Sequence, residues 1–225
     1  MSRLTQSVVA LATATAALLA LTACGGSTTP ATSASGAAPS EPLRVVADAD
    51  PHTTLLKKTE ELGLLGDVKL EIREIAGGVD PNQLVASGDV DANFFQHIPY
   101  LDNWNAEHST SLVNVAAVHI EPLGLYSKKV ATVADTPDAA VIAIPADATN
   151  QARALFLLAD AGLITLDVKA SDPGLDFAQV SERNITGNPK NVTFLQIERP
   201  ELAATLDDPQ VTLSVVNGNY ALEAG

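Results

Sequence analysis

The chain has 225 residues, and its 13 lysines and arginines stand against 27 aspartates and glutamates, for a formal net charge of −14 at pH 7. Nucleic-acid binding needs clustered basic residues that displace phosphate counterions, so this balance argues against DNA or RNA as a partner. It also argues against adhesion of the folded part to an anionic membrane surface. The single cysteine excludes a disulfide framework and any CxxC metal or redox site.

The N-terminal segment has the pattern of a secretory signal that ends in a lipidation motif. Val8 to Leu21 is an uncharged run of apolar and small residues. It is shorter than the roughly 20 residues of a membrane span and fits the hydrophobic region of a signal peptide. The letters LTAC, followed by glycine, match a bacterial lipobox whose Cys24 thiol receives a diacylglycerol. We expect a lipoprotein signal peptide over 1–23; a plain secretory signal with a chance cysteine is the alternative.

Residues 24–41 are expected to form an acylated cysteine and a flexible tether, because 25–40 contain only Gly, Ser, Thr, Pro and Ala. Beyond the tether, apolar periodicity predicts strands and helices in alternation. Strands or extended runs are predicted at 43–47, 68–73, 90–95, 113–120, 123–126, 141–144, 192–197 and 211–216. Helices are predicted at 52–65, 81–87, 100–107, 151–161 and 201–206. This order predicts an α/β fold with two, mostly parallel, sheets.

Motifs of several enzyme classes are missing from the sequence. It contains no GxSxG, GxxxxGK[ST] or GxGxxG pattern. Asp89 and Asp91 are spaced like the start of a calcium loop, but the further ligands do not follow, and we interpret them as a solvated turn. The histidines form neither HxxxH nor HExxH; they are His52, His97, His108 and His119. We therefore predict no catalysis, no metal and no cofactor.

Aromatic residues concentrate in one stretch of the chain. Four of the nine in the sequence fall within eleven residues; they are Phe94, Phe95, Tyr100 and Trp104. Apolar walls with a few fixed polar groups are typical of small-ligand pockets, and Asn93, Gln96 and His97 supply the polar groups here. The stretch therefore predicts a pocket lining, although a local core cluster is the stronger interpretation for any one of these aromatic residues alone.

Residues 91–101, DANFFQHIPYL, closely resemble a signature of the MetQ/NlpA family, the methionine-type substrate-binding lipoproteins of ABC importers. Further similar segments follow in the family's order, at 119–129, 144–153, 188–191 and 215–221. The resemblance runs from about residue 42 to the end, and the lipobox agrees with it. A small departure is Pro51-His52-Thr53-Thr54, where relatives usually carry an acidic residue after a His-Ala pair.

The resemblance implies a two-lobed periplasmic-binding architecture with the ligand cleft between the lobes. Lobe one would span 42–121 and lobe two 122–216, and 217–225 would begin a return to lobe one. Relatives carry a longer return segment, so several tens of residues are expected to be missing here: either the chain is a fragment, or lobe one is incomplete.

The residues in the similar segments suit an amino-acid ligand, whose carboxylate needs a cation or a helix N-terminus. Thr149 and Asn150 are predicted N-caps, and Arg153 is expected in the first turn of the helix that follows. A cation is unfavourable there unless an anion binds beside it. A surface Arg153 paired with Asp147 or Asp160 is the alternative.

Asn217 directly follows the predicted strand 211–216, and the carboxyl ends of strands are where open α/β sheets place ligands. Its amide offers a donor and an acceptor to a zwitterion; an ordinary helix cap is the alternative. Phe95, His97 and Tyr100 would line a slot for a thioether. The residues predicted to bind the ligand are Phe95, His97, Tyr100, Asn150, Arg153 and Asn217.

We therefore expect a lipid-anchored protein on the extracytoplasmic face of the cell membrane. It would capture L-methionine or a close analogue and deliver it to an ABC permease and its ATPase. Three alternatives remain: a binder of another small solute on the same fold, a cell-surface interaction lipoprotein without a transport role, and a secreted hydrolase. A Ser/His/Asp constellation within hydrogen-bond reach would indicate the hydrolase.

Overall fold

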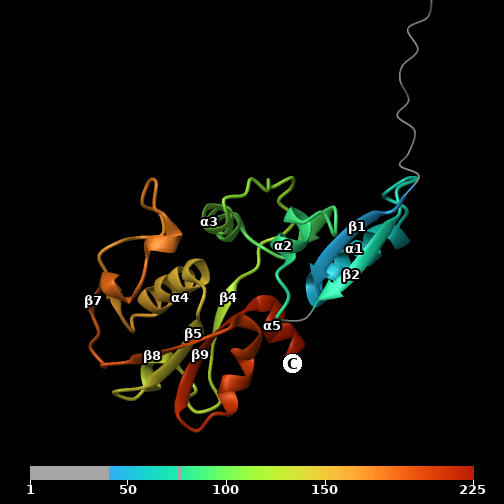
Figure 1. Ribbon diagram of the computed structural model, residues 1–225. Helices are drawn as coiled ribbons and strands as arrows, with labels where there is room; N and C mark the ends of the chain where they lie inside the picture. Colours follow the sequence, from blue (N-terminus) through green and yellow to red (C-terminus); the bar gives the residue numbers. More distant parts are fainter. Residues whose placement is uncertain (1–40, 76–77) are drawn as a thin grey trace, which may run out of the picture. The chain divides into compact units, whose positions relative to one another are not determined.

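The computed structural model describes residues 41–75 and 78–225, which belong to one compact unit (Figure 1). The predicted signal peptide over 1–23, Cys24 and all but the last residue of the predicted tether lie outside the described residues, so the lipid anchor stays a prediction. No helix in the described part is both long and apolar enough to cross a membrane.

A three-stranded parallel sheet, in the order β2-β1-β3, occupies the N-terminal part of this unit. Its strands are β1 (Leu43–Asp48), β2 (Leu70–Ile75) and β3 (Ala92–Phe94). Val46 of β1 is fully buried with Ile75 and Val90, and α2 (Pro81–Ala86) covers them. Asp80 caps α2 through its carboxylate, as its position before Pro81 predicts.

The first predicted helix is shorter than its sequence pattern. It consists of a short turn, η1 (Ala49–Thr53), and α1 (Thr54–Glu61), so it ends four residues before the predicted end. Gly63 adopts a φ of +66°, a left-handed conformation that ends the helix although the apolar pattern continues through Leu65. No residue of α1 itself is buried.

A four-stranded sheet follows in the order β4-β9-β5-β8. Its strands are β4 (Leu123–Tyr126), β5 (Val141–Pro145), β8 (Thr193–Ile197) and β9 (Val211–Asn217). β5 pairs in parallel with β8 and β9, whereas β4 pairs antiparallel with β9. The prediction of two mainly parallel sheets is confirmed, with β4 as the exception.

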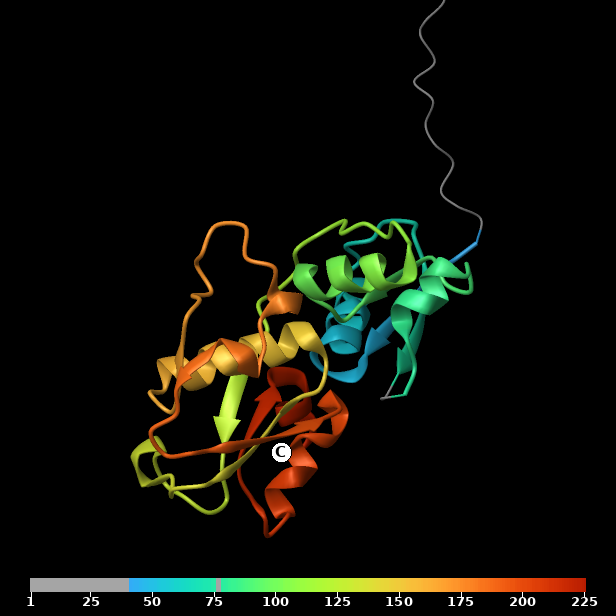
Figure 2. The same ribbon diagram turned by 60° about the vertical axis from the view of Figure 1, so that its left-hand side comes forward.

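The side chains of β5 alternate between the two faces of this sheet. Ile142 and Ile144 pack with the helix α4 (Ala148–Asp160), whereas Ala143 packs with Leu202 and the C-terminal helix α5 (Gly218–Glu223) on the other face (Figures 1 and 2). The pairing of β9 with β5 contains a register shift: Val141 pairs with Val211, but the next residue, Ile142, pairs with Leu213. Val211 and Leu213 therefore face opposite cores, although their spacing alone would place them on one face.

The remaining elements are short, apart from α3 (Ile98–His108). A two-stranded antiparallel ribbon, β6 (Thr165–Leu166) and β7 (Ile185–Gly187), was not predicted, because two or three residues carry no readable period. The predicted helix at 201–206 is wrong: two 3₁₀ turns, η5 (Arg199–Glu201) and η6 (Ala203–Asp207), occupy this region. Further 3₁₀ turns are η2 (Val133–Asp135), η3 (Phe177–Gln179) and η4 (Glu182–Asn184).

The predicted extended run 113–120 forms no strand. Its apolar side chains are largely exposed, with Val115 88% and Ile120 94% exposed. The run connects the strands of the three-stranded sheet to β4, which opens the four-stranded sheet. The lobe boundaries themselves stay a prediction.

Candidate ligand-binding site

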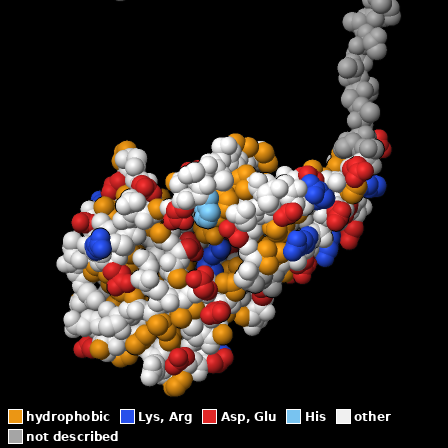
Figure 3. Space-filling model, viewed as in Figure 1, with side chains coloured by type: hydrophobic (Ala, Val, Ile, Leu, Met, Phe, Trp, Pro, Cys, Tyr) orange, Lys and Arg blue, Asp and Glu red, His pale blue; other side chains and the backbone are white. Residues whose placement is uncertain are grey.

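A cavity of about 400 Å³ is lined by residues that adjoin both sheets, a volume within the range of small-molecule sites. Its wall includes every residue predicted to bind the ligand: Phe95, His97, Tyr100, Asn150, Arg153 and Asn217. Polar residues that the sequence analysis did not assign to the site also line it: Asp48, His52, His119, Glu121, Arg199 and Asn219. Figure 3 shows histidine, basic and acidic side chains next to one another near the middle of one face.

Asp147, and not Thr149 or Asn150, caps the helix α4. Its carboxylate accepts hydrogen bonds from the Asn150 backbone N–H at 3.0 Å and from the Thr149 hydroxyl at 3.1 Å. The helix therefore begins at Ala148, three residues before the predicted start. The prediction of Thr149 or Asn150 as the N-cap is wrong, because an aspartate in the extended conformation just before them satisfies the free N–H groups.

Asn150 is the centre of a hydrogen-bond network at this helix end, and its side chain is almost fully buried. Its Nδ2 donates to both carboxylate oxygens of Asp147, at 3.0 and 3.1 Å. Its Oδ1 accepts from Arg153 Nη1 at 2.8 Å and from Asn217 Nδ2 at 3.2 Å. One amide thereby fixes the relative positions of α4 and the end of β9.

Arg153 lies in the second turn of α4, not in the first as predicted, because the helix begins earlier. Its Nη2 donates to the Glu121 backbone oxygen at 2.6 Å. Within the described residues, Arg153 forms no ion pair with Asp147 or Asp160, and the ion pair of Asp147 is with Arg199. Burial lowers the pKa of the guanidinium, and the Glu121 and Asp147 carboxylates oppose this effect.

A second arginine in the cavity wall, Arg199, has no motif that could have revealed it. Its Nε lies 3.3 Å from Asp147 Oδ2, so it occupies the partner position that the sequence analysis considered for Arg153. Its guanidinium also lies over the Tyr100 ring, 5.0 Å from the centroid, a distance at which a cation and an aromatic face attract each other.

His97 caps α3 and faces the Asn150 network. Its Nδ1 accepts a hydrogen bond from the Tyr100 backbone N–H at 3.2 Å, so in the neutral ring the proton resides on Nε2, 3.2 Å from Asn150 Oδ1. Burial, with the nearby Arg153 charge, lowers the pKa of His97 to about 4. The ring is therefore neutral at pH 7. Phe95 meets Tyr100 edge to face at 5.7 Å, which forms an apolar corner beside it.

Asn217 occupies the N-cap position of α5, but its side chain makes no cap bond. Its Oδ1 and that of Asn219 are buried without a hydrogen-bond partner among residues 41–75 and 78–225. Asn219 Nδ2 donates to the Asp48 carboxylate at 3.3 Å, and burial raises the pKa of Asp48 to about 6. Buried acceptors without donors are rare in folded proteins. These two lie beside the cavity, where a bound ligand could donate a hydrogen bond to them.

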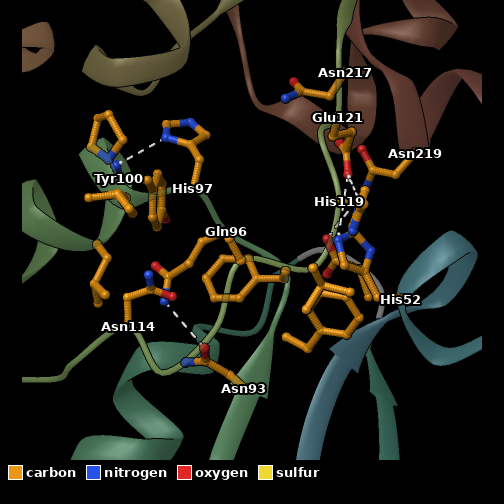
Figure 4. A pocket seen from close by; sticks show the side chains of 18 of the residues that line it. His52, Asn93, Gln96, His97, Tyr100, Asn114, His119, Glu121, Asn217 and Asn219 are labelled. Carbon is orange, nitrogen blue, oxygen red and sulfur yellow. Dashed lines mark hydrogen bonds and ion pairs between the residues drawn. The ribbon is translucent and has the colours of Figure 1, made fainter. Parts of the chain in front are cut away.

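His52, His119 and Glu121 form a separate group in the cavity wall, and among residues 41–75 and 78–225 they are the group that could hold a metal (Figure 4). Their spacing in the chain carries no signature, because only the fold brings His52 next to the other two.

In the described part of the chain, no serine hydroxyl hydrogen-bonds to a histidine ring. His97 and His108 form hydrogen bonds with Asn150, Tyr100 and Trp104 instead.

A family model described as NlpA lipoprotein matches residues 43–225. This chain belongs to the NlpA lipoprotein family. The resemblance noted in the sequence is thus confirmed.

Two curated relatives of this NlpA-family chain carry informative names. The membrane lipoprotein TpN32 of Treponema pallidum is 42% identical over 177 residues, which is 79% of this chain and 63% of that protein. The methionine-binding lipoprotein MetQ of Bacillus subtilis is 36% identical over 181 residues, 80% of this chain and 64% of that protein. The chain therefore spans just under two thirds of the length of these relatives.

Solved structures of substrate-binding proteins share the fold. A nutrient-binding protein from Burkholderia cenocepacia, solved with bound methionine, superposes with a TM-score of 0.73 at 33% identity, covering 81% of this chain and 74% of that one. A periplasmic substrate-binding protein of an ABC transporter from Coxiella burnetii gives 0.72 at 33% identity, covering 81% and 74%. The predicted α/β periplasmic-binding fold is confirmed. The relatives' names are those of transporter binding proteins and lipoproteins, not of enzymes.

Proposed function

We propose that this NlpA-family chain is the substrate-binding lipoprotein of an ABC importer, and that it captures methionine or a close analogue in the cavity described above. The names of the relatives favour this function. The observation that supports it most directly is the composition of the cavity wall, which offers complementary groups to each part of a zwitterionic, sulfur-containing amino acid.

The ligand's carboxylate would bind at Arg153, whose guanidinium reaches the cavity beside Asn150. Charge-assisted bonds from a guanidinium are among the stronger hydrogen bonds in proteins. The ammonium group would bind where acceptors lack donors, at the amide oxygens of Asn217 and Asn219 and the Asp48 carboxylate. The opposite charges of the ligand would thus meet opposite charges of the protein.

The thioether would lie against Phe95, His97 and Tyr100. Sulfur–aromatic contacts are modestly favourable. The lowered pKa of His97 keeps its ring neutral, so an apolar ligand side chain can pack against it without displacing water from a charged group. No step of this proposal requires catalysis or a cofactor.

In the cell, Cys24 would carry the lipid that holds the protein on the extracytoplasmic face of the membrane. Binding would close lobe one (42–121) on lobe two (122–216) by a hinge motion. The closed form would then be recognised by the membrane permease, whose ATPase drives import. The lobes, the anchor and these partners are parts of the proposal.

Thermal unfolding of the full chain in mild detergent, followed by circular dichroism, tests the ligand. The protein is first unfolded and refolded to remove any copurified amino acid, and then melted with each of the twenty amino acids. A ligand at about one hundred times its Kd adds about 2.7 kcal/mol, which corresponds to a melting shift of about 5–11 °C for a domain of this size. We expect this shift with L-methionine and a much smaller one with leucine, which is branched and lacks sulfur.

A flat panel from a chain with a native circular dichroism spectrum would contradict the binding of any amino acid, and would favour the alternative of an interaction lipoprotein. A shift with a different amino acid would keep the importer and overturn the choice of methionine.

A further inference from the structure

Three side chains of kinds that bind metals meet on one side of the cavity. The Nε2 atoms of His52 and His119 lie 3.5 and 3.6 Å from Glu121 Oε2. One ligand atom from each residue lies within 4.8 Å of the others. Figure 4 shows the three side chains grouped beside Asn219, on the opposite side of the pocket from His97 and Tyr100.

We propose that His52, His119 and Glu121 form a binding site for a divalent transition-metal ion, with zinc as the favoured occupant. Tetrahedral ligands at about 2.0–2.2 Å from zinc are separated from each other by about 3.3–3.6 Å. Both separations from Glu121 lie in or at the edge of this range. Two edges of the coordination tetrahedron are therefore already in place.

The remaining edge, between the two histidines, can close without disturbing the core. His52 is fixed, because only 2% of its side chain is exposed. His119 has a side chain that is 25% exposed and lies in the segment before β4, which forms no helix or strand. The ligand atoms of the two histidines lie within 4.8 Å of each other, so a shift of at most about 1.5 Å in the His119 ring brings its nitrogen to a tetrahedral separation.

The donor set favours zinc over harder cations. Imidazole nitrogens suit zinc and its neighbours in the first transition row, whereas magnesium and calcium prefer oxygen ligands. A histidine ring binds a metal through a ring nitrogen that carries no proton. The Nδ1 atom of His52 has no hydrogen-bond partner in the described part of the structure, so no hydrogen bond through that atom holds the ring in place.

Three protein ligands would leave a fourth position directed at the cavity, as in zinc sites that keep an open coordination position. Arg153, which donates to the Glu121 backbone oxygen, ties this metal site to the Asn150 network. The metal would thus lie in the same cavity as the proposed amino-acid ligand but on different side chains. The proposal does not rest on methionine binding.

The competing interpretation is an aromatic cluster without a metal. The His52 ring meets Phe94 at 4.7 Å and His119 at 5.0 Å, both edge to face. In that case the two histidines are held by packing, and Glu121 is an ordinary polar neighbour. This interpretation expects no zinc binding.

Calorimetric titration of zinc chloride into the full chain distinguishes the two. The matched variants are His119→Ala and Glu121→Gln, each partly exposed so that folding is retained, as circular dichroism must show. His108→Ala is the control, because this exposed histidine stacks on Trp104 and is not in the cavity wall. Cys24→Ser removes the only thiol of the chain. Magnesium chloride serves as the hard-cation comparison.

We expect one zinc ion per chain, no measurable magnesium binding at the same concentration, and affinity weakened by about tenfold or more in each site variant. His108→Ala and Cys24→Ser should bind zinc like the wild type. The proposal is overturned if the wild type binds no zinc, if both site variants bind as tightly as the wild type, or if either control weakens binding equally. Methionine is titrated separately into the same proteins, so the test of methionine binding is independent of the test of the zinc site.

Discussion

Removing the Arg153 guanidinium should weaken methionine binding strongly. Arg153→Ala takes away the cation proposed to meet the ligand's carboxylate, and truncating one partner of a desolvated charge pair costs about 2–5 kcal/mol. Arg153 is only partly buried, so we expect the lower part of this range, a loss of about 30- to 200-fold in affinity. Arg183→Ala, at an exposed position in η4, should leave the affinity unchanged.

The same substitution also affects the folded structure. Arg153 donates to Asn150 Oδ1 at 2.8 Å and to the Glu121 backbone oxygen at 2.6 Å. Each such bond contributes about 0.5–1.5 kcal/mol net, so the free energy of unfolding should fall by about 1–3 kcal/mol. Arg153→Lys keeps the charge but loses the planar fork, and we expect its affinity to lie between the wild type and Arg153→Ala.

Isothermal titration calorimetry at 25 °C, after removal of any bound amino acid, measures the affinities, and urea unfolding measures the stability separately. The reasoning is refuted if Arg153→Ala binds methionine as tightly as Arg183→Ala while its circular dichroism spectrum remains native. That result would mean that Arg153 only supports the protein's structure and that another group, with Arg199 the first candidate, holds the carboxylate.

Three further predictions concern other parts of the molecule. Asn150→Asp should lower the free energy of unfolding by about 1–3 kcal/mol, because it replaces the donor to Asp147 by a second carboxylate; unchanged urea unfolding would contradict the network. His97 has a folded-state pKa of about 4 against 6.5 for a free histidine, so the unfolded chain binds more protons between these values and stability should fall as the pH drops from 6.5 to 4, by up to about 3 kcal/mol. His97→Asn, which can retain the cap, should show less of this fall, and an identical pH profile would show that His97 does not titrate as inferred. Cys24→Ala should release the protein from the membrane fraction of fractionated cells; retention after a salt wash would mean that acylation is not the anchor.

The sequence by itself located most of the strands, several helices and the segment that contributes Phe95, His97 and Tyr100 to the cavity wall. Period-two alternation and helix-capping residues located most strands and α2, because these signals are local and need no knowledge of the fold. The family resemblance of residues 91–101 directed attention to Phe95, His97 and Tyr100, and the structure places all three in the cavity wall. Boundaries were less predictable where a single residue decided them, as with Asp147 at the start of α4.

Tertiary structure alone decided which distant side chains meet. Arg199 reaches Asp147 and Tyr100 from a 3₁₀ turn that has no readable pattern. His52 meets His119 and Glu121 only because η1 and the segment before β4 converge on one cavity. Local sequence patterns report the conformation of neighbouring residues, whereas such contacts depend on how whole sheets and helices pack, so no spacing in the chain could have revealed them.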